Sequence, residues 1–72
     1  MEKSRMPKIT LAAARVNAGY TQTEVASKLH VSNKTVLNWE KGISDMSYPT
    51  LKVLSDLYNM PIDFIFLPHE ST

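Results

Sequence analysis

The sequence predicts an all-α fold, a compact domain of five short helices and no strands. Four of the five segments carry apolar residues at helical spacing, and the first is a run rich in alanine without glycine or proline. Residues that favour helix starts precede several of these segments, and glycine, asparagine or proline follows them. With 72 residues, the chain can bury one modest core, and helices joined by short loops suit a core of that size.

The chain is expected to begin with a flexible arm and a first helix. Residues 1–7 carry Lys3 and Arg5 and end at a proline, which is typical of a flexible arm. The alanine-rich stretch over residues 8–18 predicts a helix, and Gly19 follows where a helix commonly ends in a left-handed residue. The folded domain is therefore expected to start at residue 8.

The second and third helices have clear start signals. Thr21 and Glu24 have the spacing of a capping box, in which each side chain accepts a hydrogen bond from the backbone of the other residue. A third helix is predicted from Ser32, as its cap, to about Lys41, and Gly42 ends it. The apolar stripe of the second helix consists of Val25, Ala26 and Leu29.

The fourth and fifth helices are predicted from their caps and prolines. Ser47 is the expected cap of helix four, Pro49 suits its first turn, and Asn59 is a suitable left-handed terminator. A short fifth helix is predicted over residues 61–67, between two prolines, and residues 68–72 are expected to be a disordered tail. The apolar positions of helix four are Leu51, Leu54 and Tyr58.

Composition excludes several classes of protein. The chain has no cysteine, so disulfides and thiolate metal sites are excluded, and its two histidines lie far apart. No apolar run approaches the roughly 18 residues of a membrane span, and the charged N-terminus does not resemble a secretory signal. A cytoplasmic protein is the expectation. The formal net charge of +1 neither supports nor excludes binding to nucleic acid, so the distribution of charge must decide.

The predicted third helix has two different faces. With about 100° of rotation per residue, one side is mostly apolar and is expected to pack against the domain. Trp39, the single tryptophan, is the expected centre of the core. The packed side consists of Thr35, Val36, Trp39 and Glu40, and the outward side of Asn33, Lys34, Leu37, Asn38 and Lys41.

The outward side has the residue types that read DNA bases. Asparagine can pair through two hydrogen bonds with adenine, and lysine can donate to the guanine acceptors or to a phosphate. Leu37 is suited to contact a thymine methyl group. The alternative is a solvated helix face on which asparagine is merely tolerated, although asparagine has a poor helix propensity.

These residues carry a resemblance to a known family. The pattern is Thr21-Gln22-x-x-Val25-Ala26-x-x-Leu29-x-Val31-Ser32-x-x-Thr35-Val36-x-x-Trp39-Glu40-x-Gly42. It resembles the helix-turn-helix regulators of the lambda-repressor/Cro-like class, also called XRE-type, and the likeness extends over residues 8–67. The resemblance implies a lambda-repressor-like DNA-binding domain whose second and third helices form the helix-turn-helix.

The resemblance also implies a role for individual residues. Gln22 is similar to the residue that binds a phosphate and braces the recognition helix, and Ser32 and Lys41 correspond to phosphate contacts at the two ends of that helix. Arg15 and Glu40 occupy the positions of a partly buried ion pair between helices one and three. The implied base-reading residues are Asn33, Lys34 and Asn38, with Leu37 as an apolar reader.

Two features depart from the family pattern. The loop after the third helix, ISDMS, contains Asp45 and no basic residue, so we expect weak phosphate binding on that side. Val53 and Leu57 are apolar on the flank of helix four where polar residues would be expected, and Phe66 is a further candidate for an exposed apolar residue, which favours a dimer interface or a protein partner. The alternative is that one or both residues of helix four pack beneath the C-terminal helix.

The sequence therefore favours a sequence-specific double-stranded DNA-binding regulator that binds a pseudo-palindromic operator as a homodimer. A compact, phage-type Cro-like regulator is the expected form. The alternative is an antirepressor, which would use the same fold to bind a partner phage repressor and block its DNA binding. Neither function calls for catalysis, a cofactor, a metal, a membrane or a small-molecule substrate.

Overall fold

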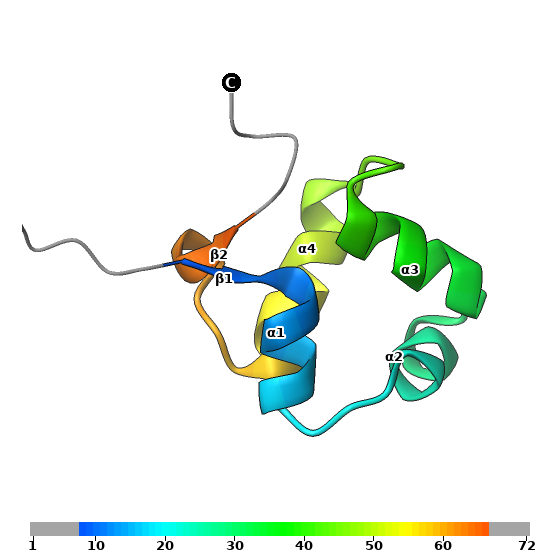
Figure 1. Ribbon diagram of the computed structural model, residues 1–72, viewed down its shortest axis with the longest axis horizontal. Coiled ribbons are helices and arrows are strands. Elements are labelled where there is room, and N and C mark those ends of the chain that lie inside the picture. The colour runs from blue at the N-terminus through cyan, green and yellow to red at the C-terminus, as the bar shows by residue number, and fades with distance from the viewer. Residues whose placement is uncertain (1–7, 67–72) are drawn as a thin grey trace, which may run out of the picture.

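A computed structural model describes residues 8–66, which form four α-helices, one short 3₁₀ helix and two strands (Figure 1). The helices are α1 (Leu11–Asn17), α2 (Gln22–Leu29), α3 (Asn33–Lys41) and α4 (Tyr48–Tyr58). The strands are β1 (Ile9–Thr10) and β2 (Ile65–Phe66), and the 3₁₀ helix η1 spans Ile62–Phe64. The predicted arm over residues 1–7 and the predicted tail over residues 68–72 lie outside the described residues.

The predicted start signals of α2 and α3 are confirmed. The hydroxyl of Thr21 accepts a hydrogen bond from the backbone of Glu24 at 3.1 Å, and the Glu24 carboxylate accepts one from the Thr21 backbone at 2.8 Å. The Ser32 hydroxyl accepts from the backbone N–H of Thr35 at 3.1 Å. Each bond satisfies an N–H group that has no partner within its own helix, which fixes where the helix begins.

Left-handed residues end three of the helices. Gly42 ends α3 with φ of 75°, and Asn59 ends α4 with φ of 55°, both as predicted. His30 ends α2 with φ of 59°, a conformation that costs a residue with a Cβ atom roughly 1–2 kcal/mol. Residues 30–32 form the whole connection between α2 and α3, so this left-handed residue sets the turn of the helix-turn-helix.

The first helix begins later than predicted. Thr10 is the cap of α1, and its hydroxyl accepts from the backbone of Ala13 at 3.0 Å. Residues 9 and 10 are extended because they form strand β1, which pairs in parallel with β2. In the register, Ile9 lies opposite Ile65 and Thr10 opposite Phe66.

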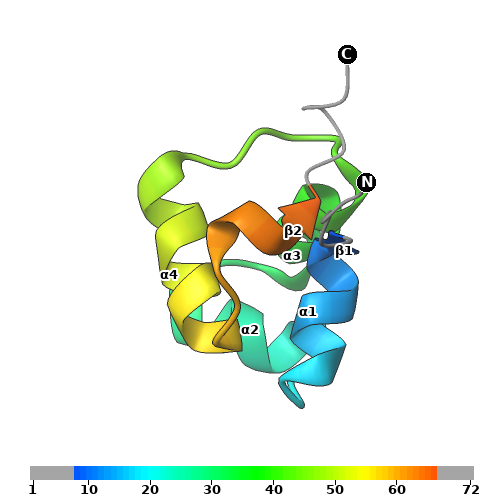
Figure 2. The same ribbon diagram turned by 90° about the vertical axis from the view of Figure 1, so that its left-hand side faces the viewer.

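The prediction of a fifth α-helix over residues 61–67, and of no strands, is wrong. Only η1 is helical there, and the chain then becomes extended at Ile65. A segment of this length between two prolines is too short to be a stable helix by itself, and a β-branched or aromatic residue suits a paired strand. Figures 1 and 2 show the strand pair beside the start of α1, on the opposite side of the molecule from α3.

Every α-helix, together with β2, contributes buried residues to the core. Val36 is the fully buried residue of α3, whereas Trp39 is only partly buried and packs at the edge of the core. The prediction that Trp39 is the core centre is therefore wrong, because the smaller Val36 points more directly inward from α3. The buried apolar residues are Leu11, Ala14, Val25, Ala26, Val36, Leu51, Leu54, Tyr58 and Ile65.

Candidate nucleic-acid interface

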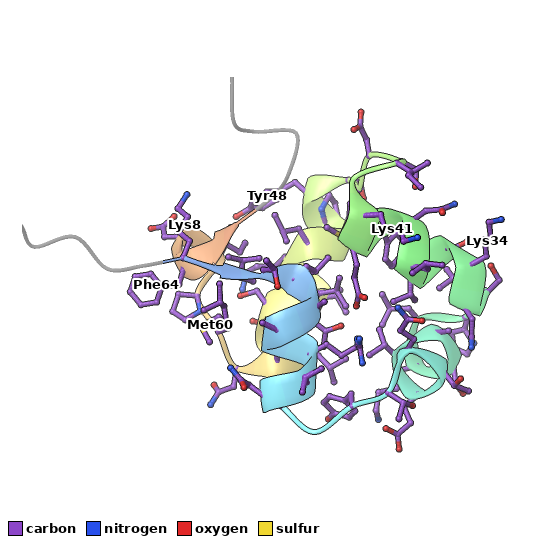
Figure 3. The ribbon with its side chains drawn as sticks, in the orientation of Figure 1. Lys8, Lys34, Lys41, Tyr48, Met60 and Phe64 are labelled. Atoms are coloured by element: carbon purple, nitrogen blue, oxygen red, sulfur yellow. The ribbon has the colours of Figure 1, made fainter. Side chains whose placement is uncertain are left out.

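The outward face of α3 is polar and carries two cations. Asn33, Lys34 and Lys41 are exposed, whereas Leu37 and Asn38 are partly buried. Figure 3 shows Lys34 and Lys41 along α3, on the side of the molecule away from Lys8. The structure thus brings the five predicted outward residues onto one helix at one edge of the domain.

An ion pair connects α3 to α1. The Nε atom of Arg15 lies 2.7 Å from Oε2 of Glu40, and the two side chains are 13% and 5% exposed. A second N–H group of Arg15 donates to the backbone carbonyl of Tyr20 at 2.9 Å. Arg15 therefore holds the α1–α2 connection and the last turn of α3 in one arrangement.

Gln22 connects α2 to the same carboxylate. Its side-chain nitrogen donates to Oε1 of Glu40 at 2.9 Å. The Glu40 carboxylate therefore receives hydrogen bonds from α1 and from α2 while belonging to α3. Gln22 thus contacts the helix that the sequence resemblance expects it to brace, and its side-chain amide has a second hydrogen that can be donated elsewhere.

Tyr58 of α4 lies close to this ion pair. Its ring packs against the ring of Tyr20, with 6.3 Å between the centroids. Burial, and secondly the negative charge of Glu40, raise the pKa of Tyr58 to about 12, although Arg15 partly offsets the rise. The Tyr58 hydroxyl is buried and makes no hydrogen bond to the part of the chain that the structure describes.

A second side-chain bond joins the first turns of α2 and α3. The side-chain nitrogen of Asn33 donates to the hydroxyl of Thr23 at 2.7 Å. Sequence reasoning did not identify Thr23 as part of the site. No local pattern indicates this contact, because it depends on the angle at which α3 crosses α2.

The predicted phosphate contacts lie at both ends of α3. The hydroxyl of Ser32 lies at the start of α3, where it caps the helix and also lies 3.0 Å from the Thr35 hydroxyl. Lys41 is exposed in the last turn, and Asp45 follows in the exposed loop. Positive charge on this face is thus concentrated on α3 itself.

The predicted apolar surface is only partly exposed. Val53 is 49% exposed, and it borders a groove with Val31 and Trp39. Leu57 packs against the core, so it does not belong to an exposed apolar surface, and the side chain of Phe66 lies outside the described part of the structure. Other apolar side chains that the sequence pattern did not indicate are also exposed, namely Val16, Ile43 and Tyr48.

Residues 8–66 contain neither a membrane-spanning helix nor a cluster of metal-ligating side chains. No helix in this range is long and apolar enough to cross a membrane. The same residues contain no cluster of three or more histidine, aspartate or glutamate side chains that could hold a metal ion.

The fold and the outward face of α3 define a helix-turn-helix domain. The sequence model of the family described as Helix-turn-helix matches residues 11–65. Over 55 residues the chain is 44% identical to the HTH-type transcriptional regulator ImmR of Bacillus subtilis (strain 168). The matched stretch covers 76% of this chain and 43% of that protein. The chain belongs to the XRE-type helix-turn-helix family. It spans less than half the length of the curated relative that it matches.

The ion pair predicts that an Arg15 variant loses much more free energy of unfolding than a Lys52 variant. Arg15→Met leaves the buried Glu40 carboxylate without its cation, and we expect a loss of roughly 3–5 kcal/mol in the free energy of unfolding. The matched control is Lys52→Met, which removes an exposed pair with Asp56 at 3.2 Å and should cost about 0.5 kcal/mol or less. Urea unfolding measures both, and equal losses would contradict the structural role of the Arg15–Glu40 pair.

The raised pKa of Tyr58 predicts a loss of stability at alkaline pH. Below pH 10 the tyrosine is protonated in the folded and the unfolded state, whereas between pH 10 and about 12 the unfolded state loses the proton first. Stability of the wild type should therefore fall as the pH rises through this window, and fall less in Tyr58→Phe. Urea midpoints at about pH 9 and about pH 11 test this, because other titrating groups are common to both proteins. Parallel pH profiles would contradict it.

Proposed function

We propose that the protein is a sequence-specific regulator of Cro/repressor type that reads the major groove of operator DNA with α3. The observation that carries this proposal is the outward polar face of α3, held at a fixed angle by the bonds of Glu40 to Arg15 and Gln22. A helix that presents donors and acceptors from its first turns can place them against base edges. The similarity to a transcriptional regulator over most of this chain supports the same function.

The proposed contacts fall into two groups. Base-reading contacts come from Asn33, Lys34, Leu37 and Asn38, of which the asparagines suit adenine and the lysine suits guanine. Phosphate contacts come from Gln22, Ser32 and Lys41, and they set the position of α3 along the duplex. The proposed function includes no catalytic step, cofactor or small-molecule substrate.

The proposed binding form is a homodimer on a pseudo-palindromic operator. One helix reads only a few base pairs, which is too little sequence to distinguish an operator from the many competing sites of a genome. Two copies bound one helical turn apart would read two half-sites, and their discrimination energies would add. The outward face of α3 adds to this need, because with Lys34 and Lys41 as its cations it can neutralise few phosphates in each copy.

A variant of Asn38 tests the base-reading role. Asn38→Ala should lose roughly 1–3 kcal/mol of binding free energy on a duplex that the wild type selects from a random library, and little on random DNA. Alanine is the better helix former, so α3 itself is expected to remain folded. Fluorescence anisotropy at fixed salt measures both affinities.

The control for this measurement is Lys8→Ala, which changes an exposed residue on the opposite side of the molecule from α3 (Figure 3). It should leave both affinities close to those of the wild type. An equal loss on selected and random DNA for Asn38→Ala would remove Asn38 from the base-reading set.

One observation favours a second candidate function, an antirepressor that binds a partner repressor. Val53 is 49% exposed at the edge of a groove that Val31 and Trp39 also line, and such a groove suits an apolar side chain of another protein. In this case the chain would occupy the DNA-binding surface of a repressor and release its operator.

A gel-shift experiment distinguishes the two functions. A direct DNA reader should shift operator DNA by itself, whereas an antirepressor should give no shift and should release DNA from the repressor encoded beside it. If release occurs through the groove, Val53→Ser should weaken it. Val16→Ser, which changes a valine that is 62% exposed on α1, is the matched control and should release DNA normally.

A further inference from the structure

The contact between Thr23 and Asn33 has a consequence for base recognition. Both residues are exposed, and their side chains meet at 2.7 Å across the two helices of the helix-turn-helix. They also border an open hollow together with Gln22 and Arg15. The side-chain nitrogen of Gln22 donates to Glu40, whereas the side-chain nitrogen of Asn33 donates to Thr23.

The chemistry of the amide shows what this contact leaves available. An asparagine side chain has two N–H donors and one carbonyl acceptor. Asn33 uses one N–H on the Thr23 hydroxyl, so one N–H and the carbonyl oxygen remain. This remaining pair is the set that matches adenine, which accepts at N7 and donates from N6.

We propose that Thr23 is a positioning residue that orients the Asn33 amide for adenine in the major groove. This inference rests on the proposed DNA-reading function. A free asparagine amide can rotate, whereas the bond to Thr23 restricts that rotation and, with the Asn33 nitrogen as the donor, leaves the carbonyl oxygen available to the groove. Thr23 thereby contributes to specificity without contacting a base.

The test compares four variants on two DNAs. The variants are Thr23→Val, which keeps the side-chain shape without the hydroxyl, Thr23→Ser, which keeps the hydroxyl, Asn33→Ala, and the double variant Thr23→Val with Asn33→Ala. The DNAs are a duplex selected by the wild type from a random library and an unselected duplex of the same length. Thermal unfolding confirms that each variant is folded.

The expected result is a loss of specificity that depends on Asn33. Thr23→Val should weaken binding to the selected duplex by about fivefold, the equivalent of one net hydrogen bond, and should change binding to the unselected duplex by less than about twofold. Thr23→Ser should bind as the wild type does. In the Asn33→Ala background, Thr23→Val should cause no further loss, because the residue that it positions is gone.

Base substitution provides a second readout. Replacing each adenine of the selected site in turn should identify one position at which the preference of the wild type is lost in both Thr23→Val and Asn33→Ala. A merely structural role of Thr23 would reduce binding at every position alike, and that result would overturn the inference.

The outcomes separate this inference from the function on which it rests. If the wild type prefers its selected duplex and Thr23→Val keeps that preference, the inference is overturned and the proposed function stands. An equal loss on both DNAs would make Thr23 a phosphate contact only, which also overturns it. If the wild type shows no sequence preference, the proposed function fails and the inference fails with it.

Discussion

The buried carboxylate of Glu40 is the constraint on which the arrangement of the helices depends. It belongs to α3, accepts from Arg15 of α1 at 2.7 Å and accepts from Gln22 of α2 at 2.9 Å. A buried charge is tolerated only when its partners are in place, so moving any one of these helices would leave a group without compensation. The outward face of α3 is therefore oriented from the inside of the domain. Tyr58 of α4 lies beside this ion pair, and its buried hydroxyl makes no hydrogen bond within residues 8–66.

Local sequence signals were sufficient to predict most of the helices but not the two strands. Thr21 and Ser32 mark helix starts through bonds to residues three positions away, and this spacing is visible in the sequence. The pairing of Ile9 with Ile65 joins the two ends of the domain, and no pattern in the residues next to either one predicts it. The chain near Ile65 has an apolar composition that suits a helix or a strand, and its distant partner decides between them.

The same difference between local and distant contacts applies to the candidate site. Helical periodicity alone placed Asn33, Lys34 and Lys41 on an outward face, because that face depends only on the geometry of one helix. The contact of Asn33 with Thr23 depends on the angle between two helices, and that angle is fixed by a three-residue turn and by Glu40. Side chains at such a crossing can be assigned only once the three-dimensional arrangement is known.

The small number of cations on the outward face of α3 makes the orientation of its side chains more important. With only Lys34 and Lys41 as cations, this face can gain little affinity by releasing counterions from a phosphate backbone. Under the proposed function, specific binding depends on directed contacts from α3, and these contacts contribute less affinity if their side chains must first be ordered from many conformations. An amide already bonded in the free protein avoids part of that entropy loss. A weakly basic helix-turn-helix can therefore discriminate between sequences when its reading side chains are held in place before DNA arrives.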